Sequence, residues 1–175
     1  VWKQWGCSSS ICDGQYFHPG WDYNGTGYCD DDRGTDIQAV AIGVVRYVNT
    51  SSWGGIVIEH LYQGTTVYSQ YGHIASAQVS VGDVVDKGQH IAEMSDVGTD
   101  CVHLHWEIRE SDHPNPQYGG YWDCGILSNG DQVENYYEHP EWWVDNHGPY
   151  GVCSAPSLVS PSDGYVASDP DRTIT

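Results

Sequence analysis

The sequence predicts a mostly β domain: an antiparallel sheet core with β-hairpins and long loops, stapled by disulfides. Many short segments are rich in Val, Ile and Tyr and are separated by glycine turns, which is typical of strands. No stretch before residue 101 shows a convincing 3.6-residue apolar period, so a helical core is not expected. Six cysteines, an even and dispersed set without a C-x-x-C pair, favour disulfides over a zinc knuckle or a redox motif.

The strands can be placed in order along the chain. We expect short strands at 37–48, with a bend or bulge at Gly43, and at 56–62, 65–71, 84–85 and 90–94. Gln63-Gly64 separates two of these runs and is a turn signal, so residues 56–71 form a predicted β-hairpin.

The segment Cys101–Arg109 carries the strongest pattern, because polar and apolar residues alternate along it. Residues two apart on a strand point to the same face, which places His103, His105 and Glu107 in one row. Two imidazoles side by side are costly without a polar or ionic partner, and a metal ion is the simplest one. One of the two histidines could then bind the metal, and the other would face the molecule that the metal binds.

A second candidate for metal binding is His18-Pro19-Gly20-Trp21-Asp22. Proline and glycine between His18 and Asp22 exclude a regular helix, so a loop or strand end turns both side chains toward one point. An imidazole and a carboxylate brought together in this way suit Zn²⁺.

The remaining segments give coarser predictions. Residues 1–17 are expected to form an irregular arm, and residues 23–36 a loop. The acids Asp30-Asp31-Asp32 in that loop could bind calcium, although a solvated surface run is more common and the spacing is not that of an EF-hand. Residues 110–153 are loop-rich and aromatic, with a short helix expected within 134–144. We therefore predict a domain at 1–153, followed at 154–175 by a linker or the start of a further module.

Charge and cysteine content narrow the partners and the compartment. The formal net charge of −18 argues against nucleic acid and anionic membranes as partners. No apolar run resembles a signal peptide, so we expect that a signal peptide, with or without a propeptide, has been removed. We expect a secreted, extracellular monomer. The disulfide pairing cannot be deduced from the sequence.

Taken together, these motifs resemble the lysostaphin-type zinc endopeptidases, also called the LytM family. His18-x-x-x-Asp22, then Tyr71-x-His73, then His103-x-His105 occur in the family's order. Further similar stretches are Gly34–Val45, Val81–Gln89 and His103–Glu107. The resemblance covers roughly residues 18–110 and implies the LytM/lysostaphin-type fold. The acidic loop that carries Cys29 is not a feature that we recognise as general to the family.

The resemblance implies a catalytic site with one Zn²⁺ ion. Its metal ligands would be His18, Asp22 and His105, which leaves a fourth position open for water. His73 and His103 would be the catalytic histidines, one as general base and the other in stabilising the transition state or protonating the leaving amine. Which histidine has which role stays open.

Other polar residues have two interpretations each. Tyr71 could bind substrate or be a packed aromatic residue. Glu107 could orient a ligand histidine or form an ordinary ion pair with Arg109 or Arg46. For the other histidines a surface or core role is expected, and His60 is the one that could approach the cleft. They are His60, His90, His113, His139 and His147.

The predicted function is a secreted zinc metalloendopeptidase. The resemblance implies cleavage at or next to glycine, in peptidoglycan cross-bridges or in glycine-rich proteins such as elastin. One alternative is a non-catalytic module on the same fold that binds peptidoglycan or polysaccharide or has a regulatory role. Another treats the tryptophans and tyrosines as a carbohydrate-binding platform and the histidines as structural. The sequence has no H-E-x-x-H helix and no G-x-S-x-G elbow, so other protease and esterase classes gain no support.

Overall fold

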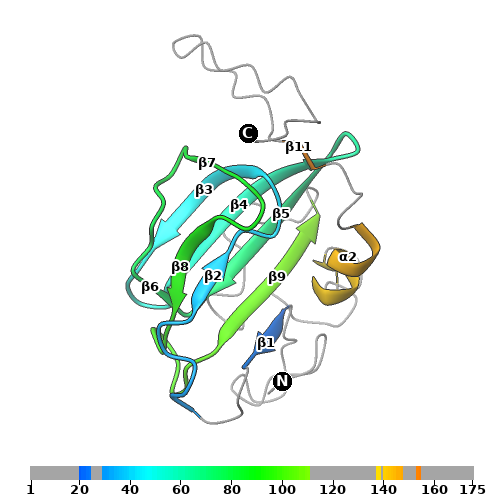
Figure 1. Ribbon diagram of the computed structural model, residues 1–175. Helices are drawn as coiled ribbons and strands as arrows, with labels where there is room; N and C mark the ends of the chain where they lie inside the picture. Colours follow the sequence, from blue (N-terminus) through cyan, green and yellow to red (C-terminus); the bar gives the residue numbers. More distant parts are fainter. Residues whose placement is uncertain (1–19, 25–28, 111–136, 139, 148–152, 155–175) are drawn as a thin grey trace.

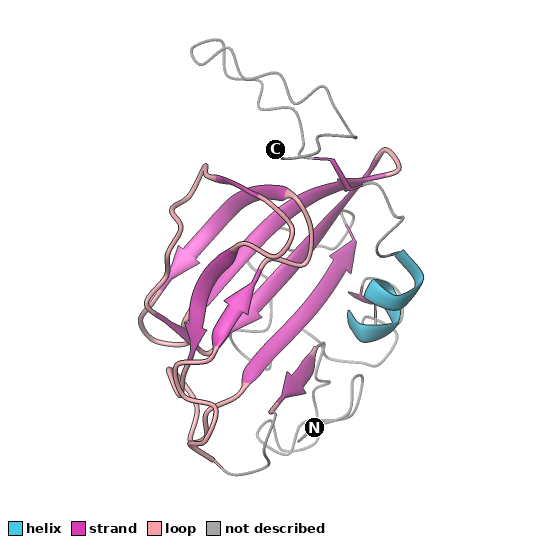
Figure 2. Cartoon of the chain, in the orientation of Figure 1, coloured by secondary structure: helices cyan, strands magenta, loops and turns pink. Residues whose placement is uncertain are grey.

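The computed structural model describes residues 20–24, 29–110, 137–138, 140–147 and 153–154. The strands are β1 (Trp21–Tyr23), β2 (Asp36–Gln38), β3 (Gly43–Asn49), β4 (Gly55–Tyr62), β5 (Thr65–Gly72), β6 (Ile74–Ala75), β7 (Val84–Val85), β8 (His90–Met94), β9 (Leu104–Glu110), β10 (Tyr137–Glu138) and β11 (Cys153–Ser154). One helix, α2 (Pro140–His147), is described. The predicted mostly β fold is confirmed (Figure 2).

The strands form two antiparallel sheets. The larger sheet has the order β1-β9-β5-β4-β3-β7, with β10 paired to β9 and β11 paired to β4. The smaller sheet has the order β2-β8-β6 and lies against one face of the larger sheet (Figure 1). The main core fills the space between the sheets. It includes Ile37, Ile74 and Ile91 from the smaller sheet and Ile56, Ile58 and Tyr71 from the larger one.

The predicted hairpin is present as β4 and β5. Tyr62 pairs with Thr65, so the connection is the two-residue turn Gln63-Gly64. Both turn residues have positive φ, 49° and 85°, which is the conformation that a tight antiparallel hairpin requires. The run at 37–48 is broken at 39–42, Gly43 begins β3, and the pairing of β3 with β4 has a register shift between Val45 and Tyr47.

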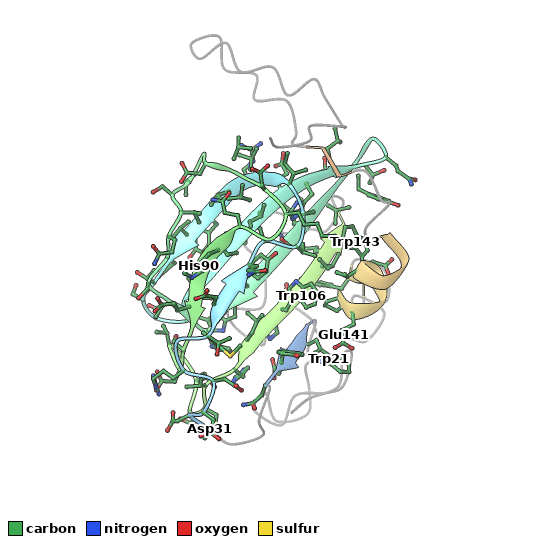
Figure 3. The ribbon with its side chains drawn as sticks, viewed as in Figure 1. Trp21, Asp31, His90, Trp106, Glu141 and Trp143 are labelled. Atoms are coloured by element: carbon green, nitrogen blue, oxygen red, sulfur yellow. A yellow bond between two sulfur atoms is a disulfide. The ribbon has the colours of Figure 1, made fainter. Side chains whose placement is uncertain are left out.

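Helix α2 packs beside β9 (Figure 3). Trp143 from the helix joins a second, small cluster with Val67 and Ile108, and its ring lies edge-on to Tyr62 at 5.6 Å between centroids. A short helix was expected within 134–144, and the helix found begins inside that range and ends beyond it, at His147. None of the described helical residues form a segment long and apolar enough to cross a membrane.

Strand alternation gives the larger sheet two chemically different faces. Tyr71 pairs with Ile56 and Trp106, so these three side chains share the face that packs on the smaller sheet. Gly72 pairs with His105, which therefore lies on the opposite face. The core and the candidate site are built on opposite faces of the same strands.

Candidate functional site

Asp22 and His105 are brought together by the pairing of β1 with β9. They are register partners in this antiparallel pair, and Nδ1 of His105 lies 2.9 Å from Oδ1 of Asp22. Both side chains are buried, at 8% and 3% exposure. Gly20 lies against the His105 ring, because a Cβ at Gly20 would come within 2.5 Å of Nε2. Only glycine allows the β1 backbone to approach this closely.

Glu107 contacts the other nitrogen of the same ring. Its Oε1 lies 2.9 Å from His105 Nε2, and its side chain is fully buried. Burial lowers the pKa of His105, but the hydrogen bonds to Asp22 and Glu107 outweigh burial and raise that pKa to about 9. Burial also raises the pKa of Glu107, against the opposing effect of His105. Two buried carboxylates around one imidazole require a positive charge between them, either a proton or a metal ion.

His73 lies at the end of β5 with a positive φ of 58°, an uncommon conformation for a residue other than glycine. Its Nδ1 is 2.9 Å from the carbonyl oxygen of Val97. Because a carbonyl only accepts, Nδ1 carries the hydrogen and Nε2 of the neutral ring keeps its lone pair. Burial, together with the nearby His103 and His105, lowers the pKa of His73 to about 3. His73 is therefore neutral at physiological pH.

His103 lies just before β9 and reaches the same site. Its Nδ1 is 2.9 Å from the carbonyl oxygen of Cys101, which fixes the same tautomer as in His73. Its Nε2 is 3.6 Å from Oδ1 of Asp22, and its ring centroid is 4.4 Å from that of His73. Two imidazoles that each carry the hydrogen on Nδ1 thus lie side by side next to the Asp22–His105 pair.

A disulfide fixes this arrangement at the start of the strand. Cys29 is bonded to Cys101, across a sequence separation of 72 residues. Beside the disulfide, the Val102 amide donates to the Cys29 carbonyl at 2.7 Å, and the Asn24 side-chain amide donates to the Val102 carbonyl at 3.0 Å. The expectation of disulfides is confirmed for this pair. It links the chain segment after Asp22 to the strand that carries the histidines.

Tyr71 is not where its predicted role in substrate binding requires it. The side chain is 2% exposed within the main core, and its hydroxyl accepts a hydrogen bond from the Val40 amide at 2.9 Å. The prediction assumed that Tyr71 and His73 share a strand face. The positive φ of His73 ends that alternation, so His73 turns toward the site while Tyr71 stays in the core. The packed-aromatic interpretation fits the structure.

The remaining alternatives are resolved in part. His60 is fully buried on the core face, between the Ile42 carbonyl and the Ser69 hydroxyl, so it does not approach the site. Arg46 pairs with Glu59 and not with Glu107. Glu107 contacts His105 directly, which favours the orienting role over an ordinary ion pair.

The acidic loop has ion pairs of its own. Near this loop, Arg33 binds Asp30 and Asp96.

Trp53, in the loop between β3 and β4, is a site residue that the sequence analysis missed. Its ring centroid lies 5.0 Å from that of His73 and 5.8 Å from that of His105. Gly54-Gly55 directly after it is the sequence signal that could have found it, because adjacent glycines often mark a close approach of other groups to the backbone.

The donor types present fit a zinc ion in chemistry, because zinc binds carboxylate oxygens and imidazole nitrogens. Asp22 Oδ1 and His105 Nδ1 lie at a hydrogen-bond distance of 2.9 Å. The third predicted ligand, His18, lies outside the described residues. Within the described part of the chain, no group of three or more His, Cys, Asp and Glu side chains that could hold a metal ion is found. The ligand set therefore stays a prediction.

Comparison with known proteins identifies the family. The protein-family model described as "Peptidase family M23" matches residues 16–117, which is more than half of the chain. The chain belongs to peptidase family M23. The resemblance to lysostaphin-type enzymes is confirmed at this level.

Individual relatives agree with the family. The chain is 39% identical over 83 residues to a lipoprotein NlpD/LppB homolog of Pseudomonas aeruginosa. That match covers 46% of this chain and only 27% of the relative. Among solved structures, the catalytic domain of the antimicrobial peptidase lysostaphin from Staphylococcus simulans has a TM-score of 0.55 at 18% identity, covering 82% of this chain and 90% of that one. A longer lysostaphin structure gives 0.51 at 19% identity, covering 75% and 45%. These structures confirm the fold.

Proposed function

We propose that this M23 chain is a secreted zinc endopeptidase that hydrolyses peptide bonds at or next to glycine, in peptidoglycan cross-bridges or glycine-rich proteins such as elastin. The observation that carries the proposal is the buried Asp22–His105 pair, faced by two histidines with fixed tautomers. The glycine preference rests on the ordered motifs. The disulfide supports an extracellular location, because such bonds persist in oxidising compartments.

In this proposal, His18, Asp22 and His105 hold the zinc ion. When bound, zinc polarises the scissile carbonyl and lowers the pKa of a water molecule. The chain would bind as a monomer to its peptide substrate, through the domain at 1–153, with 154–175 as a linker or the start of a further module.

The chain's own residues perform the proton transfers. Each of His73 and His103 donates from Nδ1 to a backbone carbonyl, so each presents a lone pair at Nε2. Such a nitrogen can accept a proton from the attacking water and later pass it to the leaving amine. After protonation, the same nitrogen can donate a hydrogen bond to the oxyanion. The adjacency of the two rings allows these roles to be divided between them.

Glu107 has an orienting role in this proposal. It binds Nε2 of His105 and so leaves Nδ1 as the nitrogen that faces Asp22. A carboxylate behind a ligand histidine fixes the ring orientation and increases the basicity of the ligand nitrogen.

Metal content and cleavage together test the proposal. The purified protein is expected to contain one zinc ion per chain, and a chelator is expected to abolish cleavage that added zinc restores. Incubation with pentaglycine-cross-linked cell wall and, in parallel, with elastin should release new ends that mass spectrometry locates next to glycine. Protein without stoichiometric zinc, which binds cell wall but releases no peptide ends, would favour the binding-module alternative.

Histidine variants test the assignments within the site. His73→Gln and His103→Gln are expected to reduce cleavage by about 100-fold or more while retaining zinc. His18→Gln is expected to lose zinc. His90→Gln is the matched control. His90 lies in β8 of the smaller sheet, and its ring contacts Asp36 and the Ala92 carbonyl. Full cleavage by His18→Gln with normal zinc content would refute its place among the ligands.

A further inference from the structure

The row of residues that contains the proposed zinc ligands Asp22 and His105 continues across the sheet as two glycines. Asp22 on β1 pairs with His105 on β9, His105 pairs with Gly72 on β5, and Gly72 pairs with Gly55 on β4. All four positions therefore lie on one face of the sheet. Two strands supply metal-binding side chains, and the next two supply no side chain at all.

The indole of Trp53 occupies the space that the two glycines leave. A Cβ at Gly55 would lie 2.6 Å from Cζ3 of Trp53, and a Cβ at Gly72 would overlap the same ring. The indole thus lies directly on the backbone of β4 and β5, beside the ligand row. The plane of the indole is inclined by 55° to the His73 ring and by 72° to the His105 ring.

The loop that carries Trp53 is held firmly. The Gly54 amide donates to the Ser51 carbonyl at 2.9 Å, and the Ile74 amide donates to the Gly54 carbonyl. Gly98, from a third loop, packs so closely that a Cβ there would lie 2.6 Å from the Trp53 Cα. These contacts position the indole beside the two histidines.

The Trp53 side chain is only partly buried, although it contacts the most buried part of the site. A large aromatic ring that retains exposed surface next to reactive groups is well suited to contact a substrate. Its flat surface can pack against a peptide backbone that has no side chain. A substrate residue with a Cβ needs more room beside the ring than glycine does.

We propose that Trp53 is a specificity-determining residue, the wall that admits glycine and excludes larger residues next to the scissile bond. This inference rests on the proposed function, because it concerns the substrate of the same site. It assigns glycine selectivity to a residue other than the histidines and the proposed metal ligands. Because the effect is steric, a variant with a smaller side chain at position 53 should also accept larger substrate residues.

Substrate selectivity of Trp53 variants tests the inference. The substrates are a pentaglycine peptide and a series in which one glycine at a time is replaced by L-alanine. The measured quantity is the ratio of kcat/KM for each alanine peptide to kcat/KM for pentaglycine. In Trp53→Ala we expect this ratio to rise by about tenfold or more at one position next to the scissile bond, since one methyl group in a tight site discriminates by about that factor. Trp53→Phe should give a smaller rise.

A ratio is the right quantity because both substrates are cleaved by the same active molecules. Partial unfolding or zinc loss in a variant changes both kcat/KM values by the same factor, so their ratio does not change. Trp106→Phe is the matched control: Trp106 is also partly buried and neighbours His105 in sequence, but it lies on the core face of β9, so its ratio should equal that of the wild type. The position of Trp106 on the strand is labelled in Figure 3.

The outcomes separate this inference from the proposed function. If the wild type cleaves pentaglycine but both Trp53 variants keep the wild-type ratio within twofold, Trp53 does not determine specificity and the proposed function stands. If the wild type cleaves the alanine peptides with the same kcat/KM as pentaglycine, Trp53 does not exclude residues larger than glycine and this inference is wrong. If the wild type cleaves none of the peptides although it contains zinc, the proposed function is wrong and this inference falls with it.

Discussion

His60 and His105 are two buried histidines on opposite faces of the same sheet, and their surroundings give them opposite properties. His60 lies between two neutral groups, the Ile42 carbonyl and the Ser69 hydroxyl, and burial lowers its pKa to about 4. His105 lies between two carboxylates, which outweigh burial and raise its pKa to about 9. Burial is similar at the two positions, so partner chemistry decides whether a histidine is a neutral part of the core or a site for positive charge.

Replacing each histidine by glutamine gives the largest contrast. His105→Gln is expected to lose zinc binding and to reduce cleavage to background, because it removes the proposed ligand nitrogen. His60→Gln should keep both properties and lose about 1 to 3 kcal/mol of unfolding free energy, since its partners are neutral. Zinc content by atomic spectroscopy and cleavage of cell wall measure the first effect, and denaturant unfolding measures the second. A folded His60→Gln variant without zinc would show that His60 also contributes to zinc binding, and the contrast between the two histidines would be wrong.

The pH dependence of stability tests the neutral state of His60. Its pKa of about 4 in the folded chain lies below the value near 6.5 expected when the chain is unfolded. Between those values only the unfolded state gains a proton, so stability present above pH 6.5 is lost as the pH falls toward 4. The loss from His60 alone is about 3 kcal/mol.

This loss is measured as a difference between two proteins. Unfolding free energies of the wild type and of His60→Gln are compared from pH 7 to pH 4, so that groups common to both proteins cancel. The wild type should lose more stability than the variant across this range. Parallel curves for the two proteins would mean that His60 is not buried in its neutral form.

Glu107→Gln sharpens the other side of the comparison. The variant keeps a hydrogen-bonding group next to His105 Nε2 but removes the negative charge. Zinc affinity, measured by competition with a chelator of known affinity, is expected to fall by about 10- to 100-fold. Unchanged affinity would show that the orientation of His105 does not depend on the charge of Glu107.

Ser69→Ala is the matched change on the core face, and it should have the smallest effect. It removes the hydroxyl that contacts His60 Nε2 at 2.7 Å, and it is expected to cost about 1 to 2 kcal/mol of unfolding free energy. Zinc affinity should not change, because Ser69 lies on the face opposite the proposed zinc ligand His105. A loss of zinc affinity as large as that of Glu107→Gln would show that the two faces are not independent.

Much of the fold was predictable because strand periodicity is local. Alternation along residues 101–109 correctly predicted that His105 and Glu107 share a face opposite Trp106 and Ile108. The turn at Gln63-Gly64 was equally local, since both residues adopt positive φ. The same rule failed at Tyr71, because a positive φ at His73 interrupts the alternation that the prediction assumed.

The sequence by itself determined the mostly β fold, the family and the set of candidate histidines, because periodicity, turn residues and ordered motifs are properties of the chain alone. Only the tertiary structure decided that Cys29 bonds Cys101 and that Trp53 lies over Gly72. Each of these contacts joins segments whose relative positions depend on strand pairing and loop packing. No local pattern encodes them, because the pairing brings together residues that the chain keeps far apart.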